Sequence, residues 1–329
     1  MKNTLEYLFT GNRLSRDEAR DILLNVGKGI YSEAEFASFL TVFRMRPITP
    51  EELAGFQTAM VELSLPTDLS AYHAIDIVGT GGDGKNTFNI STLSAFIVAG
   101  TGINVTKHGN YAATSTSGAS NVLEYLGYRF SNDPEKLKKD LEKGGFCFMH
   151  APLFHPAMKH IAPVRRALKV PTFFNILGPM INPSSPRFQL LGVNNQEVFS
   201  LYENVYKNTD TSYMIINSLD GYDEISLTCD AIFASNKQEG KFSPADFGFK
   251  KIGPEKLYGG STIKEAANIF INILEGKGEK EQEQVVLSNA ALGIKVVHPK
   301  KELTDCVAEA RESLESGKAL QKLKAVINS

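Results

Sequence analysis

The hydrophobic residues of the first 70 positions recur at the spacing of a helix. Ile22 and Val26 lie one turn apart behind the segment SRDE at 15–18, which has the form of a capping box with its serine as N-cap. A similar pattern covers 33–42, and TPEE at 49–52 predicts another helix start, with proline at the first helical position. This part of the chain is therefore predicted to contain only helices.

From residue 74 onward, short apolar or β-branched runs alternate with helical patterns. Such alternation is typical of α/β proteins with a largely parallel sheet. The runs expected to form strands are 75–78, 103–106, 213–217 and 225–228. The helical patterns lie near 91–100, 117–126, 134–143, 156–168, 195–208, 262–275, 279–292 and 302–326. Residues 231–260, with several Gly, Pro, Lys and Ser, are expected to be irregular surface structure.

The expected fold class is therefore α/β, in two domains. Residues 1–70 form a small all-helical N-terminal domain, and residues 71–329 form a large α/β domain around a central, mostly parallel sheet. The 329 residues suffice for two domains, and 42% hydrophobic with 22% charged residues is ordinary for a soluble globular enzyme.

Charge and cysteine content exclude several classes of protein. The net charge of −2 gives no broadly basic surface for nucleic acid, and no apolar run approaches the ~20 residues of a membrane span. The three cysteines, Cys147, Cys229 and Cys306, form no C-x-x-C pair and fit reduced thiols better than disulfides or a zinc site. With no signal-peptide core at the N-terminus, we expect a cytoplasmic protein without nucleic-acid or membrane partners.

A glycine-rich loop is the strongest local signal. The sequence GTGGDG at 79–84 directly follows the β-branched run 75–78 and precedes a helical pattern. A glycine turn between strand and helix lets backbone N–H groups surround an anion, and the helix N-terminus adds partial positive charge. The loop therefore predicts a phosphate site.

Two known phosphate motifs match this loop only in part. Residues 79–84 satisfy the dinucleotide pattern G-x-G-x-x-G, yet no acidic residue for a ribose hydroxyl occurs between Asp83 and Glu124. The same loop resembles a P-loop, but Asn86 stands where the magnesium-binding Ser or Thr belongs. A tight turn whose glycines serve only packing is the remaining alternative.

A second polar loop, 107–120, follows the predicted strand 103–106. Ligands of α/β sheets collect at the carboxyl ends of strands, so Lys107 is placed to meet an anion. Hydroxyls and amides nearby offer neutral hydrogen bonds. Ser91 or Thr92 is the expected N-cap of the helix after the glycine loop. For the second loop, the alternative to a ligand site is a plain polar loop with Ser117 as the cap of the next helix.

Charged residues elsewhere suggest further ligands. Asp223 and Glu224 are adjacent carboxylates after a predicted strand, which suits magnesium; solvated turn acids are the alternative. The guanidinium of Arg165 can bind a carboxylate through two hydrogen bonds, although Arg165 and Arg166 alone also fit a surface pair. The chain has neither Cys/His metal spacing nor a G-x-S-x-G elbow.

Short motifs follow one another along the chain in a specific order. They are GTGGD at 79–83, NIST at 89–92, KHGN at 107–110, APLFHPAMKHIAPVRR at 151–166, FNILGP at 174–179, NP at 182–183 and DE at 223–224. Together they closely resemble the anthranilate phosphoribosyltransferase family, over essentially the whole chain. That family transfers the phosphoribosyl group of phosphoribosyl pyrophosphate to the amine of anthranilate and releases pyrophosphate, with magnesium, in tryptophan biosynthesis.

The resemblance also implies organisation and site residues. It implies a homodimer formed through the helical domain, a return of residues from about 163 to 187 to that domain, and no side chain with an assigned proton-carrying role. Anthranilate would contact Gly79, Asn110 and Arg165, and magnesium Ser91, Asp223 and Glu224. Phosphoribosyl pyrophosphate would contact Gly79, Gly82, Asp83, Thr87, Asn89, Ile90, Ser91, Thr92, Lys107, His108, Gly109, Asn110, Tyr111, Ala112, Ala113, Thr114, Ser115 and Ala119.

The second loop departs from the family pattern. Tyr111 stands where the family often has Arg, and Thr116 where it commonly has Lys, so positive charge near the ribose phosphate is lost. Thr114 and Ala119 replace serines, and Asn121 replaces Asp. We expect backbone amides and the hydroxyls of Thr114, Ser115 and Thr116 to compensate.

Two other functions share parts of this pattern. A pyrimidine nucleoside phosphorylase-like enzyme would lack the acidic pair 223–224 and the segment from His155 to Arg165. A non-catalytic nucleotide-binding paralogue is disfavoured by the intact Asp83, Lys107 and acidic pair.

Overall fold

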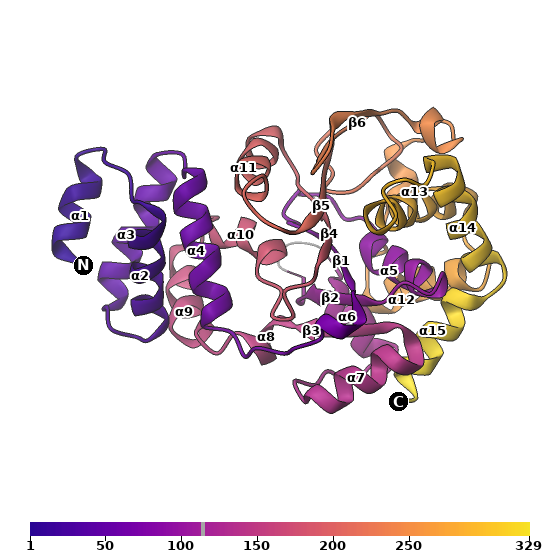
Figure 1. The fold of residues 1–329 in the computed structure, drawn as a ribbon, viewed down its shortest axis with the longest axis horizontal. Helices are drawn as coiled ribbons and strands as arrows, with labels where there is room; N and C mark the ends of the chain where they lie inside the picture. The colour runs from indigo at the N-terminus through magenta and orange to yellow at the C-terminus, as the bar shows by residue number, and fades with distance from the viewer. Residues whose placement is uncertain (113–115) are drawn as a thin grey trace.

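The computed structural model describes residues 1–112 and 116–329, so the predicted ligand contacts Ala113, Thr114 and Ser115 lie outside the described residues. Helices α1 to α4 and α9 form a bundle beside a larger part built on a seven-stranded sheet (Figure 1). The N-terminus lies in the bundle and the C-terminus in the larger part. No helix of the described ranges is long and apolar enough to cross a membrane.

The first four helices follow the sequence signals closely. Capping boxes at Ser15, Ser32 and Thr49 each place the N-cap side chain on a backbone N–H, while a glutamate three residues on accepts from the N-cap. The predicted starts are confirmed, and they were predictable because a capping box involves only residues three positions apart. The four helices are α1 (Lys2–Phe9), α2 (Arg16–Gly27), α3 (Glu33–Met45) and α4 (Pro50–Glu62).

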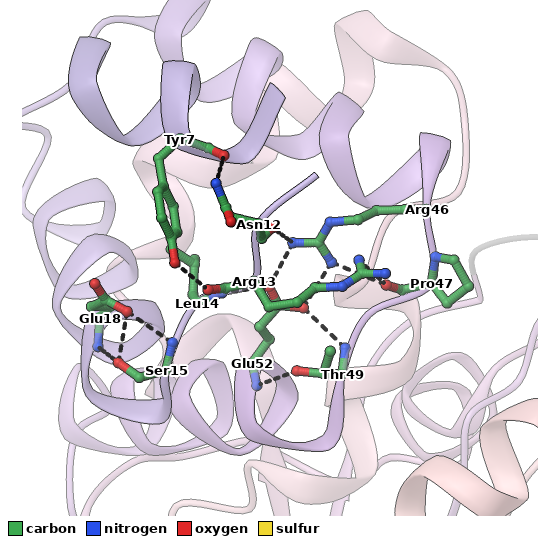
Figure 2. A network of polar contacts seen from close by, with 10 residues as sticks. All are labelled: Tyr7, Asn12, Arg13, Leu14, Ser15, Glu18, Arg46, Pro47, Thr49 and Glu52. Atoms are coloured by element: carbon green, nitrogen blue, oxygen red, sulfur yellow. Dashed lines mark hydrogen bonds and ion pairs between the residues drawn. The ribbon is translucent and has the colours of Figure 1, made fainter. Parts of the chain in front are cut away.

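One capping glutamate is also the centre of a buried network that ties the bundle's loops together (Figure 2). The Glu52 carboxylate accepts from both terminal nitrogens of Arg46, at 2.6 and 2.9 Å, and from the Leu14 N–H at 3.0 Å. Burial alone would raise the pKa of Glu52, but Arg46 and the backbone donors outweigh it and the pKa is lowered. The network joins the α1–α2 loop to the α3–α4 connection.

The chain later returns to this bundle. Helix α9 (Met158–Leu168) packs against α2 and α3, with Ile161 in the same buried cluster as Phe39. Phe173 stacks on Phe56 with ring centroids 4.3 Å apart, just before α10 (Phe174–Leu177). The short helix α8 (Ala151–Phe154) leads into this excursion.

The sheet has the order β3-β2-β1-β4-β5-β6-β7. The first five strands in this order pair in parallel, and β6 and β7 are antiparallel, which confirms the predicted mostly parallel sheet. Carboxyl ends of the parallel strands therefore share one edge. The strands are β1 (Ile75–Gly79), β2 (Val105–Gly109), β3 (Phe146–His150), β4 (Phe188–Gly192), β5 (Ser212–Ser218), β6 (Ala231–Ser235) and β7 (Glu239–Phe242).

Both faces of the sheet are buried. On one face Leu190 and Ile216 join the main core with helices α5, α13, α14 and α15; on the other, Leu191 and Ile215 join the core shared with α11 and the bundle (Figure 1). Alternate residues of a strand face opposite sides, so one sheet serves both cores. The helices of this part are α5 (Ile90–Gly100), α6 (Ala119–Tyr125), α7 (Pro134–Gly144), α11 (Gln196–Tyr206), α12 (Ile263–Leu274), α13 (Lys280–Val297), α14 (Leu303–Glu315) and α15 (Lys318–Ile327).

Three expectations of secondary structure are wrong. Residues 225–228 form no strand, because the Asn289 side chain of α13 bonds both the N–H and the carbonyl of Ile225 in place of a neighbouring strand. The region expected to be irregular contains β6 and β7. The single helix expected over 302–326 breaks into α14 and α15 at Gly317, whose φ is +75°. Strands β3 and β4 were not anticipated either.

Candidate active site

The glycine loop begins where β1 ends, and its first glycine is needed for close packing. A Cβ at Gly79 would lie 2.1 Å from Asp223 Oδ2, and one at the paired Gly192 would lie 1.6 Å from the Asp223 carbonyl oxygen. The two glycines therefore allow the acidic turn to pack against the strand ends. The Gly81 N–H donates to Asp223 Oδ2 at 2.7 Å, so the loop and the predicted metal ligand are in direct contact.

A segment that sequence reasoning missed supports the far side of this loop. Asn86 donates to the Gly260 carbonyl at 2.8 Å and accepts from the Gly259 N–H at the same distance. Thr87 forms an isolated bridge with Tyr258. Asn86 Oδ1 also accepts from the Thr116 N–H at 3.2 Å, which joins the two predicted ligand loops. Asn86, which stands at the serine position of a P-loop, thus holds neighbouring segments together in this protein. The paired glycines at 259–260 were the only sequence signal for this support.

Helix α5 begins at Ile90, before either of its predicted N-caps. Its N-cap is Asn89, so the expectation of Ser91 or Thr92 is wrong. The Ser91 N–H instead donates to Glu224 Oε1 at 3.2 Å, a tertiary contact that a local signal cannot reveal. Asn89 donates to the Ser117 carbonyl at 3.3 Å, and its Oδ1 is buried without a hydrogen-bond partner among the described residues. Its acceptor is therefore available to a ligand.

Lys107 lies on the floor of the site. Its Nζ donates to the Ile77 carbonyl and to Ser91 Oγ, the latter at 3.2 Å. The residue is 2% exposed. Burial lowers the pKa of Lys107, while the charges of Asp76, Glu224 and Asp223 oppose that shift. The ammonium therefore connects β1, β2 and the first turn of α5 beside the acidic pair.

The acidic residues of the site, of which Asp223 is buried and Glu224 and Asp83 are half-buried, lack enough positive charge around them. Burial, and then the charge of Asp83, raise the pKa of Asp223 to about 6. Burial and the charges of Asp223 and Asp83 raise the pKa of Glu224 well above its ordinary value, and burial also raises that of Asp83. Carboxylates that repel one another in this way favour a bound cation.

The donor set suits magnesium if a substrate completes it. In the part of the chain that the structure describes, no group of three or more His, Cys, Asp or Glu side chains is placed to hold a metal ion. Magnesium is usually held by one or two carboxylates together with substrate phosphates, not by an all-protein cage. Asp223 and Glu224 provide these carboxylates. Their raised pKa values show that their negative charge is not fully compensated by the protein, which suits a bound cation.

The second loop is arranged by its neighbours. His108 Nδ1 donates to the Gly178 carbonyl at 3.0 Å, and burial lowers the pKa of this imidazole to about 3. Tyr111 donates to Glu124 at 3.2 Å, and its ring lies 5.0 Å from that of His150. The Tyr111 side chain is thus directed along the protein surface, where it is 41% exposed.

The expected cap at the end of this loop is also wrong. Gly118, not Ser117, is the N-cap of α6. The Ser117 hydroxyl is buried with no hydrogen-bond partner in the described ranges. Because buried polar groups are normally paired, this hydroxyl, next to Asn89, is a further group that a ligand would satisfy.

Arg165 lies apart from the other predicted site residues. It is on α9 of the bundle, where Nη2 donates to Asn175 Oδ1 at 3.4 Å and the guanidinium lies 5.2 Å from the Phe174 ring centroid. Burial lowers the pKa of this guanidinium. Within residues 1–112 and 116–329 it has neither a carboxylate partner nor a hydrogen bond to Gly79 or Asn110. The structure brings together the glycine loop, Ser91, Lys107 and the acidic pair, and leaves Arg165 in the bundle.

The fold and the site define an α/β enzyme for a phosphorylated substrate, with a helical bundle at its N-terminus. Residues 2–64 match the model of the glycosyl transferase family, helical bundle domain, and residues 71–320 that of the glycosyl transferase family, a/b domain. Within this class, the chain belongs to the anthranilate phosphoribosyltransferase family.

Close relatives and solved structures of that family align along the whole chain. The anthranilate phosphoribosyltransferase of Flavobacterium psychrophilum is 52% identical over 324 residues, with 98% of each chain covered. A solved one from Thermus thermophilus is 33% identical, with a TM-score of 0.92 and 98% of each chain covered. One from Saccharomyces cerevisiae, in complex with PRPP and Mg, is 29% identical with a TM-score of 0.91, over 98% of this chain and 96% of that one.

Proposed function

We propose that this chain transfers the phosphoribosyl group of phosphoribosyl pyrophosphate to the amine of anthranilate, releasing pyrophosphate, as a step of tryptophan biosynthesis. The observation that carries the proposal is the contact of the glycine loop and α5 with the acidic pair: Gly81 N–H on Asp223 and Ser91 N–H on Glu224, beside buried Lys107. The relatives named above support the identity of both substrates.

Phosphoribosyl pyrophosphate occupies the carboxyl edge of the sheet. Its pyrophosphate end lies on the loop from Gly79 to Thr87 and on the first turn of α5, and its phosphoribosyl end lies on the loop that starts at Lys107. Asn89 Oδ1, which has no hydrogen-bond partner in the part of the chain that the structure describes, supports this position, because a ribose hydroxyl would satisfy it. The relative from Saccharomyces cerevisiae binds PRPP and Mg.

Ser91, Asp223 and Glu224 would hold magnesium, which would supply charge neutralisation for the departing pyrophosphate. The raised pKa of Asp223, caused by burial and by Asp83, supports this assignment. Lys107 contributes a fixed positive charge at the same place. Structures of the yeast relative carry Mg, one of them in a variant.

Anthranilate is bound between the bundle and the sheet edge, with its carboxylate on Arg165 and its ring near Gly79 and Asn110. Among the described residues Arg165 has no carboxylate partner, and this supports the role, since a half-buried guanidinium can bind a carboxylate through two hydrogen bonds. A relative from Saccharomyces cerevisiae has been solved with 4-fluoroanthranilate.

The chemistry needs positioning more than proton transfer. The neutral amine of anthranilate forms a bond to the anomeric carbon as the bond from that carbon to pyrophosphate breaks, and the amine then loses a proton to water or to the released pyrophosphate, so no strong base is required. The loops hold the two substrates in line, and Lys107 stabilises negative charge that grows on the leaving group. Accordingly, no side chain is assigned as a general acid or base.

The chain works as a cytoplasmic homodimer formed through the bundle. Apolar side chains on α1 and α3 support the interface: Phe9 is 66% and Met45 83% exposed. Three free cysteines support a reducing compartment. Analytical ultracentrifugation of the full chain and of the Phe9→Glu, Met45→Glu variant tests the dimer; monomeric wild-type protein at micromolar concentration would contradict it.

The decisive experiment follows the fluorescence of anthranilate. Addition of phosphoribosyl pyrophosphate and magnesium to the enzyme is expected to remove that fluorescence, and omission of magnesium to prevent the loss. The matched control is the Asp223→Asn, Glu224→Gln variant. A folded wild-type protein that leaves anthranilate unchanged would contradict the proposal.

A further inference from the structure

Regular backbone pairing stops early between the two strands that carry the ligand loops. β1 and β2 pair in register only at Ile75 and Val105, whereas β1 pairs with β4, and β2 with β3, over five positions each. Beyond the first pair, β1 and β2 remain neighbours in the sheet without further ladder pairs. Their carboxyl ends begin the glycine loop and the Lys107 loop, so the separation of these strand ends sets the spacing of the two loops.

Beyond that first pair, side chains supply hydrogen bonds between β1 and β2. Asp76 Oδ1 on β1 accepts from the His108 N–H on β2 at 3.2 Å. Lys107 on β2 donates to the Ile77 carbonyl on β1. Asn182, which belongs to neither strand, inserts its amide nitrogen between them and donates to Asp76 Oδ2 and to the Thr106 carbonyl, each at 2.8 Å.

The inserted asparagine is held firmly by its own segment. Its Oδ1 accepts from the Ser184 N–H at 3.0 Å and from the Ser184 hydroxyl at 2.8 Å, so the amide orientation is fixed by donors on one side and acceptors on the other. Asp76 is fully buried and Asn182 is 2% exposed. Every polar atom of the pair is therefore satisfied by protein.

The same segment leads directly from the helical bundle. Residues 178–184 follow α10 and precede β4, and Gln57 of α4 donates to the Met180 carbonyl at 3.1 Å. The Gly178 carbonyl accepts from His108 Nδ1 at 3.0 Å. A continuous chain of contacts thus runs from α4 through this segment to the ends of β1 and β2.

We infer that Asp76 and Asn182 form a positioning pair that sets the separation of β1 and β2 and links the position of the bundle to the binding of phosphoribosyl pyrophosphate. The inference rests on the proposed function, because that substrate spans the loops after both strands. Neither side chain contacts the substrate; each acts through Lys107, His108 and the glycine loop. The negative charge of Asp76 also helps Lys107 to stay protonated despite its burial.

The first test is Asp76→Asn. The amide oxygen of the new asparagine can accept from either His108 or Asn182, and its nitrogen, a donor, then faces the other donor, so the bridge between the strands is broken. We expect the KM for phosphoribosyl pyrophosphate, and its Kd by calorimetry with magnesium, to rise about tenfold or more, while kcat falls by less than about threefold. Calorimetry needs no anthranilate, so a failure of the proposed acceptor substrate does not hide a failure of the pair.

The second test restores the match of donor and acceptor. The paired exchange Asp76→Asn with Asn182→Asp lets the amide donate to the carboxylate, which still accepts from Ser184, although Thr106 loses its donor. We expect this double variant to recover at least about threefold of the lost affinity relative to Asp76→Asn. Defects that do not act through the contact between these two side chains give no such recovery, because independent changes would add.

The matched control is Asp140→Asn, which alters another buried aspartate, bonded to Tyr128 and Lys136 on α7. It is expected to lower stability with no change in KM. If Asp76→Asn does not fold, Asn182→Ser, which leaves the carboxylate in place, is judged by the same Kd. A folded variant with wild-type Kd and KM would overturn the inference, as would a double variant no better than the single one.

Discussion

Two glutamates in this chain, Glu52, which is buried, and Glu224, which is half-buried, have opposite surroundings. Glu52 in the bundle accepts from Arg46 and from the N–H groups of Leu14 and Thr49, and its pKa is lowered. Glu224 at the sheet edge accepts from the Ser91 N–H, lies beside two other carboxylates, and its pKa is raised well above the ordinary value. The salt bridges of the described chain include Glu52 but neither Glu224 nor Asp223.

The contrast shows that burial of a charge is not by itself a sign of function. In the bundle the protein supplies all the compensation, so the carboxylate holds two loops together and has nothing left for a ligand. At the sheet edge compensation is incomplete, which leaves negative charge for a cation and its phosphate. Variants of each region are therefore expected to affect different quantities.

The largest effect is expected at the acidic pair. Asp223→Asn with Glu224→Gln removes the charges assigned to magnesium, so kcat/KM should fall by at least about a thousandfold, in the range of lost electrostatic stabilisation. Thermal unfolding should show unchanged or increased stability, since repulsion between buried carboxylates is relieved. Turnover that keeps its wild-type dependence on magnesium would contradict the assignment.

The bundle should show the reverse behaviour. Glu52→Gln leaves Arg46 partly buried without its counter-charge and is expected to lower the free energy of unfolding by about 3 kcal/mol. Below the unfolding transition, KM and kcat should stay at wild-type values. Glu18→Gln, in an exposed capping box, is the control and should cost about 1 kcal/mol or less. Urea denaturation measures both, and a loss of activity in folded Glu52→Gln protein would break the comparison.

A variant of Arg165 tests whether the bundle contributes to substrate binding at the sheet edge. Arg165→Ala is expected to raise the KM for anthranilate by about 10- to 100-fold, the worth of a hydrogen-bonded charge, and the KM for phosphoribosyl pyrophosphate by less than about twofold. Initial rates with each substrate varied in turn measure the split. The neighbouring exposed Arg166→Ala serves as control. Equal increases for both substrates would rule out the carboxylate role.

The sequence predicted what local chemistry decides. Ser15 and Thr49 cap helices because their partners lie three residues away, and the parallel sheet follows from alternating patterns. The cap of α5 was missed because the Ser91 N–H is taken by Glu224, 133 residues later. Residues 225–228 have the composition of a strand, but Asn289 takes their backbone bonds.

The same limit applies to the site. That the glycine loop, Ser91, Lys107 and the acidic pair would meet follows from strand ends sharing an edge and from the family resemblance, and the contacts agree. The Arg46–Glu52 pair and the Asp76–Asn182 pair depend on how separate segments pack, which no spacing along the chain encodes. The ligand roles of the individual site residues stay predictions.

The smallest expected effect concerns the pH range in which each region loses its contribution to the free energy of unfolding. Burial lowers the pKa of His155 to about 4 and that of His108 to about 3, and His155 Nε2 lies 3.2 Å from His108 Nε2. Because the unfolded chain binds these protons at a higher pH, near 6.5, the stability they contribute is complete above that pH and is lost as pH falls toward 4. Glu52, with a lowered pKa, weakens only below its ordinary value of 4.5.

His155→Gln should therefore flatten the pH dependence of the free energy of unfolding between pH 6.5 and 4 by about one proton, or roughly 1.4 kcal/mol per pH unit. Glu52→Gln should leave that window unchanged and alter the slope only at lower pH. Urea denaturation at half-unit pH steps measures both, with the exposed His298→Gln as control. If His155→Gln keeps the wild-type slope, the histidine is not held neutral in the folded chain, and acid sensitivity would not separate the site from the bundle.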